Sequence, residues 1–198
     1  AASGGRCLSF GTLHPYSPDP RGDVEHLLEL GLHGVKLHPD MQRFALNDPK
    51  AMKLYELVGG RVPFLLHTGD YRFSFSNPEQ LKPVLEAFPE TTFVGAHMGG
   101  YTIWKEAARA LAGRYDNLYV DISSTFFGVT REEAVSMVRA YGAERVLFGT
   151  DFPMWRPKDE VEKFLALPLT GREQQMIAWD NGAALLHLKQ PLQAAAGA

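Results

Sequence analysis

The feature that most constrains this chain is a recurring unit in which a short apolar run ends in a histidine or an aspartate, in most cases with Gly or Pro close behind. Six such runs occur, ending at His14, His38, His67, His97, Asp121 and Asp151. The intervals between these residues are 24, 29, 30, 24 and 30 positions, about the length of one strand plus one helix. Polar side chains therefore recur at one end of successive predicted strands, where parallel barrels place their chemistry.

Helix signals lie between the runs, so each predicted strand is followed by a predicted helix. Four helix starts carry a recognisable cap: Asp48-Pro49, Asn77-Pro78, Thr130 with Glu133, and Thr170 with Glu173. An alternating pattern of this kind builds either an open doubly wound sheet or a closed barrel. The sequence has no Gly-x-Gly-x-x-Gly or Walker turn after a strand, which disfavours the nucleotide-binding sheet.

The polar strand ends favour an α/β fold of the TIM type, a (β/α)8 barrel that is incomplete, with about six strand-helix units present. We expect one domain over residues 1–190 and a flexible tail over residues 191–198, which are rich in alanine. A chain of 198 residues is long enough for one sizeable core.

The composition of the chain indicates which kinds of binding partner to expect. The chain is 45% hydrophobic and 22% charged, with a formal net charge of −3 and no long block of one sign. Bulk electrostatics therefore gives no reason to expect nucleic acid or a membrane surface as a partner, and a small-molecule substrate is favoured. No apolar stretch has the length of a membrane span. The single Cys7 cannot form an internal disulfide, so we expect a cytoplasmic location.

Three of the strand-end residues suggest a catalytic centre. His67, His97 and Asp151 could each have a structural role alone, but all three follow equivalent strands. Imidazole and carboxylate together suit a divalent metal ion, with zinc as the first candidate and manganese or iron as alternatives. Such a metal activates water, Asp151 could accept the proton of that water, and His97 could polarise the substrate.

Five strand-end motifs and the closing helix carry a resemblance to a known family. The motifs lie at Gly34 to Pro39, Leu66 to Gly69, Gly95 to Gly100, Val120 to Ser123 and Val146 to Pro153, and the helix contains Trp179 to Leu186. Together they resemble the amidohydrolase-related family, the branch of the amidohydrolase superfamily that includes aminocarboxymuconate-semialdehyde and resorcylate decarboxylases beside hydrolases. The resemblance covers the chain from about Phe10 to Leu188.

The resemblance implies roles for individual residues. His67 matches the metal-binding histidine of the fifth barrel strand, Asp151 matches the metal-binding aspartate of the eighth, and His97 matches the sixth-strand histidine that acts beside the metal. Lys36 stands on the fourth strand, where it either directs its ammonium group at a substrate carboxylate or pairs with a neighbouring acid. For His14 and His38, each followed by proline, a structural hydrogen bond is the expected role.

The chain departs from the family pattern at one point: it contains no His-x-His pair, which supplies two metal ligands on the family's first strand. By register, the sequence opens near the third strand. A stable piece of a longer enzyme is the expected explanation; the alternatives are an upstream segment on another chain, or a homo-oligomer that covers the open barrel edges. Two remaining ligands alone would hold a metal weakly.

Aromatic and basic residues in the strand-end loops suggest a substrate class. Arg72 could bind a carboxylate, and Trp155 could contact a flat, partly apolar body. Three hypotheses follow for this chain: a metal-dependent hydrolase, a non-oxidative decarboxylase of an aromatic or unsaturated carboxylic acid, and a non-catalytic remnant without a complete metal site. The first two use the same residues, so only the products of an assay separate them.

Overall fold

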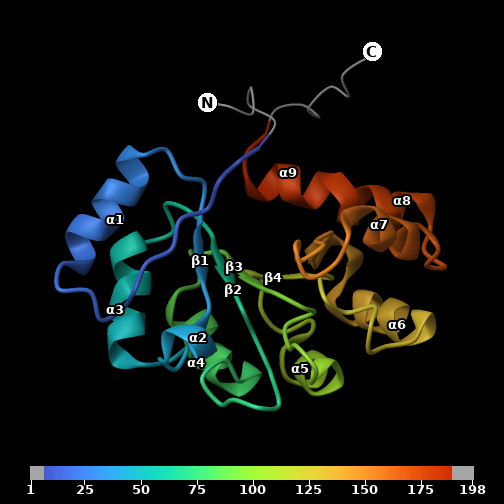
Figure 1. The fold of residues 1–198 in the computed structure, drawn as a ribbon, viewed down its shortest axis with the longest axis horizontal. Helices are drawn as coiled ribbons and strands as arrows, with labels where there is room; N and C mark the ends of the chain where they lie inside the picture. Colours follow the sequence, from blue (N-terminus) through green and yellow to red (C-terminus); the bar gives the residue numbers. More distant parts are fainter. Residues whose placement is uncertain (1–6, 189–198) are drawn as a thin grey trace.

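The computed structural model describes residues 7–188, and a five-stranded parallel sheet lies at its centre (Figure 1). The strands pair in chain order. Their bounds are β1 Val35–Leu37, β2 Phe64–Leu66, β3 Phe93–Gly95, β4 Leu118–Asp121 and β5 Val146–Leu147. Sequential parallel order is the arrangement of a barrel, because a doubly wound sheet reverses its strand order part-way along.

Helices alternate with the strands, and Figure 1 shows α3 to α6 following one another around the sheet. Their bounds are α1 Pro20–Glu29, α2 Pro39–Gln42, α3 Pro49–Val58, α4 Pro78–Ala87, α5 Trp104–Leu111, α6 Arg131–Tyr141, η1 Ala143–Arg145, α7 Pro157–Leu165, α8 Gly171–Gln175, η2 Met176–Asp180 and α9 Asn181–Leu185. Right-handed crossovers between neighbouring parallel strands place successive helices on the same face. The fold is therefore an incomplete (β/α)8 barrel, as the sequence predicts.

The two faces of the sheet differ in burial. Phe64 and Leu66 of β2 are fully buried in the hydrophobic core, and Tyr55 of α3 packs its ring edge against Phe64 at a centroid distance of 5.0 Å. Between them, Leu65 is only half-buried, as is Lys36 of β1. The continuous apolar run from Val62 to Leu66 predicts a strand buried on both faces, and this prediction is wrong for Leu65. The opposite face, which carries Lys36, is the inner face of the barrel.

The first of the six predicted strands is not formed as a strand. Gly11 makes one isolated parallel bridge to Val35, donating its N–H to the Gly34 carbonyl at 2.9 Å and accepting from the Lys36 N–H at 2.7 Å. The run continues into His14-Pro15, where proline has no N–H to extend a ladder. This first unit thus keeps its place beside β1, but its pairing is reduced to a single bridge.

The predicted helix starts are confirmed. The side chains of Asp48 and Asn77 cap α3 and α4, each with proline in the first turn, and capping boxes open α6 and α8. Across residues 7–188, none of the helices has both the length and the apolar character needed to cross a membrane. The predicted tail over residues 191–198 lies outside the described residues.

Candidate active site

The strand register brings polar residues to one edge of the sheet. Leu37, Leu66, Gly95 and Val120 lie in register across β1 to β4. The residues that follow them, or end the strand, lie at the carboxyl edge: His38, His67, His97, Asp121 and, beyond β5, Asp151. This is the edge where parallel barrels carry their active sites.

The backbone bends sharply at this edge. His97, Met98, Ser124 and Asp151 adopt positive φ angles of 60°, 53°, 47° and 56°. Each such conformation costs on the order of 1–3 kcal/mol in a non-glycine residue and persists only where its surroundings hold it. At His97 and Met98 the support comes from Asp121, whose side chain accepts the His97 N–H at 3.2 Å and whose carbonyl accepts the Met98 N–H at 2.6 Å. Strain of this kind is typical of functional sites.

A chain of hydrogen bonds fixes which ring nitrogens carry hydrogen in His97 and His67. The Ser123 carbonyl, 3.1 Å from His97 Nδ1, can only accept, so in the neutral ring His97 Nδ1 is the donor. His97 Nε2 then accepts from His67 Nδ1 at 3.1 Å. His67 Nε2 is left with its lone pair and without hydrogen. The Asp121 carboxylate reaches the same network because it accepts from the Ser123 hydroxyl, which lies 3.0 Å from His97 Nδ1.

His67 is buried, with 8% of its surface exposed, and within residues 7–188 its Nε2 has no hydrogen-bond partner. Burial first, and then the neighbouring His97 and His38, lowers the pKa of His67 to about 2, so the ring is neutral at pH 7. Its ring stacks on that of His38 at 3.9 Å and 11°, and its Nε2 lies 3.8 Å from Asp40 Oδ2. A buried, neutral imidazole with a free lone pair fits the requirement of a metal ligand.

Asp40 contributes a buried carboxylate to this edge of β1. Its Oδ1 accepts the Ser76 N–H at 3.2 Å, and the Ser76 hydroxyl contacts both Oδ2 and, at 2.6 Å, the Gly69 carbonyl. Burial raises the pKa of Asp40. Ligand atoms of Asp40, His38 and His67 all lie within 4.8 Å of one another. Sequence reasoning missed Asp40 because it begins a helix rather than ending a strand.

Lys36 and Asp151 are near the same opening. Burial lowers the pKa of Lys36, while attraction to Asp121 and Asp151 acts in the opposite direction. Asp151 is exposed and accepts the Ser124 hydroxyl at 2.6 Å, and Ser124 Oγ accepts the indole N–H of Trp155 at 2.7 Å. The lysine therefore lies within electrostatic reach of two strand-end carboxylates.

Aromatic rings line part of this edge. Trp155 stacks on Phe127 at 5.2 Å and 19°, Phe127 contacts Tyr101 at 5.8 Å, and Tyr101 contacts His97 at 5.4 Å. Phe127 is exposed, and Trp155 and Tyr101 are half-buried. The three rings form a continuous apolar border from the β5 loop to the histidine pair. We name Trp155, Phe127 and Tyr101 the aromatic border.

Arg72 is held by a carboxylate of its own loop. Its Nε donates to Asp70 Oδ1 at 2.9 Å and its Nη2 donates to Asp70 Oδ2 at 2.7 Å. The Arg72 guanidinium, through these bonds, lowers the pKa of Asp70. A guanidinium in this geometry has Nη1 left for another acceptor, so any contact of Arg72 with a substrate must be shared with Asp70.

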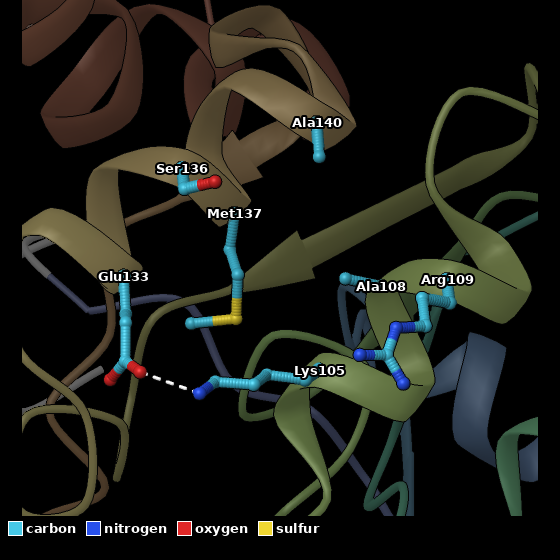
Figure 2. Close-up of a pocket in the computed structure, with 7 residues that line it drawn as sticks. All are labelled: Lys105, Ala108, Arg109, Glu133, Ser136, Met137 and Ala140. Carbon is cyan, nitrogen blue, oxygen red and sulfur yellow. Dashed lines mark ion pairs between the residues drawn. The ribbon is translucent and has the colours of Figure 1, made fainter.

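A separate pocket lies on the outer layer between α5 and α6 (Figure 2). Its lining includes Lys105, Arg109 and Met137, and Lys105 pairs with Glu133 at 2.5 Å. The strand-end residues do not line it. This pocket is therefore distinct from the candidate site at the carboxyl edge.

The family model described as Amidohydrolase matches residues 2–188, nearly the whole chain. The chain belongs to the amidohydrolase family. The chain is also 33% identical over 117 residues to protein fluG of Emericella nidulans, an alignment covering 55% of this chain and 13% of that protein. The chain therefore matches a small part of this relative's length.

Solved structures confirm the barrel. An uncharacterised TIM-barrel protein from Bordetella bronchiseptica superposes with a TM-score of 0.78 at 25% identity, covering 91% of this chain and 66% of the other. A dihydroxybenzoic acid decarboxylase from Polaromonas, with bound manganese and the inhibitor 2-nitroresorcinol, superposes with a TM-score of 0.68 at 18% identity, covering 92% and 70%. The chain thus spans about two thirds of the length of these barrels.

Proposed function

We propose that this chain carries a metal-dependent active site at the carboxyl edge of the sheet and acts as a hydrolase on a small, carboxylate-bearing molecule with a flat, partly apolar body. The observation that supports this most strongly is the buried Nε2 of His67, which has a free lone pair and no partner among the described residues. An unpaired polar atom in the interior is costly unless a ligand satisfies it.

His67 and Asp151 are the residues proposed to hold the metal. Imidazole with carboxylate suits zinc, and it also suits the manganese that the Polaromonas decarboxylase binds. When bound, such an ion lowers the pKa of a coordinated water toward about 7. Asp151, which is exposed and accepts the Ser124 hydroxyl, is the residue proposed to accept the proton of that water.

His97 is the proposed acid in the reaction. Its Nδ1–H is fixed by Ser123, and the Asp121 carboxylate lies behind Ser123, so a positive charge on the ring would be stabilised through the hydroxyl. Its Nε2 accepts the His67 Nδ1–H and carries no hydrogen in the neutral ring, so His97 would act as an acid only after Nε2 takes up a proton, which it would then give to a leaving group. Asp121 and Ser123 are then positioning residues for His97.

Lys36, Arg72 and Trp155 are the proposed substrate contacts. The Lys36 ammonium lies on the inner face of β1 and could neutralise a substrate carboxylate. Trp155, as part of the aromatic border, offers an apolar edge to a ring. Arg72 could donate through Nη1 while Asp70 keeps its other nitrogens.

Non-oxidative decarboxylation is a second candidate, and the combination of Lys36 with the aromatic border favours it. In that reaction the carbon–carbon bond to the carboxylate breaks, carbon dioxide leaves, and a proton from His97 or Asp151 takes its place on carbon. Running the assay in water enriched in oxygen-18 separates the two reactions. Hydrolysis places solvent oxygen in the product, whereas decarboxylation releases carbon dioxide and leaves the rest of the product unlabelled.

The test uses a panel of aromatic amides, esters, lactones and carboxylic acids with the metal-loaded protein. We expect His67→Ala to abolish turnover and the matched variant His14→Ala to keep it, because the His14 Nε2 contacts the Gln42 carbonyl away from the histidine pair. Equal turnover by both variants would contradict the proposed site. A folded, metal-free protein with no turnover on any substrate would favour the third hypothesis, a non-catalytic binding subunit.

A further inference from the structure

We propose that His38, Asp40 and His67 form a divalent-cation site built from the adjacent ends of β1 and β2. It deepens the proposed function, on which it rests for the assignment of His67 as a ligand. This site shares His67 with the ligand pair His67 and Asp151 proposed above. Its other two ligands, His38 and Asp40, follow β1, whereas Asp151 follows β5.

The ligand atoms of His38, Asp40 and His67 lie slightly farther apart than they would around a bound ion. The three ligand atoms lie within 4.8 Å of one another, and His67 Nε2 is 3.8 Å from Asp40 Oδ2. Metal–ligand bonds of roughly 2.0–2.2 Å place neighbouring ligands about 3–3.5 Å apart. Side-chain rotations that shorten the longest separation by up to about 1–2 Å would therefore bring the three atoms to bonding geometry.

His67 is the fixed member of the set. Its Nδ1–H is held by His97 Nε2, which leaves Nε2 as the metal-binding nitrogen in the arrangement common to metal-ligating histidines. The residue is more than nine-tenths buried, and this nitrogen has no other partner in residues 7–188. A cation is the kind of ligand that satisfies a buried lone pair beside a carboxylate.

Asp40 is also held in place. It is 6% exposed, and two groups of Ser76 bond to its carboxyl group, one to each oxygen. Oδ2 is the oxygen that faces His67. The carboxylate therefore stands next to the free nitrogen without relying on a flexible side chain.

His38 is the member that must move. Its ring lies parallel to that of His67, so the in-plane lone pairs of the two rings do not converge. Its Nδ1 accepts the Met41 N–H at 3.4 Å, a long hydrogen bond that little opposes a rotation. The residue is half-buried, which leaves room on its solvent side. Coordination therefore requires this ring to turn out of the stack until one of its nitrogens faces His67 Nε2.

The ligand types select the ion. Two imidazoles and one carboxylate suit Zn²⁺, Co²⁺, Mn²⁺ or Fe²⁺, whereas Mg²⁺ and Ca²⁺ prefer oxygen ligands. The charged groups acting on His67 are Lys36, which opposes a cation, and Asp70, which favours one. Asp70 is already paired with Arg72, so Asp40 supplies the compensating charge.

The test is titration of chelator-treated protein with Co²⁺, followed by calorimetry and by the visible absorption of bound cobalt, neither of which requires turnover. We expect one ion per chain in the wild type, and at least about a tenfold weaker affinity with an altered spectrum in Asp40→Asn and His38→Gln. His14→Gln is the matched control and should bind as the wild type does. Far-ultraviolet circular dichroism of every variant identifies any that fail to fold, and His38→Gln, at a half-buried position, provides the result if Asp40→Asn does not fold.

The variant Asp151→Asn separates the two ligand sets. Weakened binding in Asp40→Asn and His38→Gln, with Asp151→Asn unchanged, supports the site. Weakened binding in His67→Ala and Asp151→Asn, with Asp40→Asn and His38→Gln unchanged, overturns the site and leaves the proposed function standing. Absence of binding to the folded wild type overturns both.

Discussion

Substituting Gly69 with alanine tests whether the ends of β2 and β3 meet as the structure places them. Gly69 has a φ of 75°, and a Cβ added there would lie 2.5 Å from Gly100 Cα and 2.6 Å from Tyr101 N. The left-handed conformation costs alanine about 1–2 kcal/mol. Separating two backbone segments costs about 1–3 kcal/mol more, so Gly69→Ala should lower the free energy of unfolding by about 2–5 kcal/mol.

Substitutions at two other glycines separate the conformational cost of Gly69→Ala from its steric cost. Gly31 has a φ of 66° with nothing within 4 Å of its added Cβ, so Gly31→Ala should show the conformational cost alone, about 1–2 kcal/mol. Gly182, inside α9, has no close neighbour and no positive φ, and Gly182→Ala should be neutral or stabilising by up to about 1 kcal/mol. Urea unfolding followed by circular dichroism measures all three. The reasoning is refuted if Gly69→Ala loses no more stability than Gly31→Ala.

Four other outcomes are expected. Arg72→Gln should lower the unfolding free energy slightly at pH 7, and this loss should shrink in acid titrations as the pH falls through the lowered Asp70 pKa, since a lowered carboxyl pKa stabilises the fold only above that pKa; a loss that does not change with pH would contradict the pair. Tyr141→Phe should cost about 1–3 kcal/mol in urea unfolding, because the buried Met98 carbonyl loses its donor. Thr130→Ala should cost about 1 kcal/mol by the same assay. Chelator treatment should abolish turnover, and added Zn²⁺ or Mn²⁺ should restore it; turnover that persists in excess chelator would contradict a metal requirement.

Periodicity and caps predict most of the fold because they are local. The helix starts at Asp48 and Asn77 need only a side-chain oxygen followed by proline, and both form as predicted. The strand predicted at Gly11 to His14 fails because pairing depends on a neighbour and on free N–H groups, and the run has one neighbour, β1, and a proline at its end. Leu65 is less buried than the apolar run around it predicts. The reason is that burial on the inner face of the sheet depends on which other elements cover that face.

The sequence predicts a residue of the candidate site only where that residue directly follows an apolar strand. His67 and His97 were found because each follows an apolar run, and the register places their rings 4.9 Å apart. Asp40 and Ser123 carry no such signal, since their roles come from contacts across 36 and 26 positions that a single sequence does not reveal. Likewise, Arg72 looks like a free cation in the sequence, and the structure pairs it with Asp70.

The central claim is that His67 Nε2 is a metal ligand at the carboxyl edge of the sheet. Crystals grown with Zn²⁺ and measured at its absorption edge test this most directly. The account predicts an anomalous difference peak at about 2.0–2.1 Å from His67 Nε2. A well-ordered His67 with no peak at that nitrogen, or a peak confined to other residues, would contradict it.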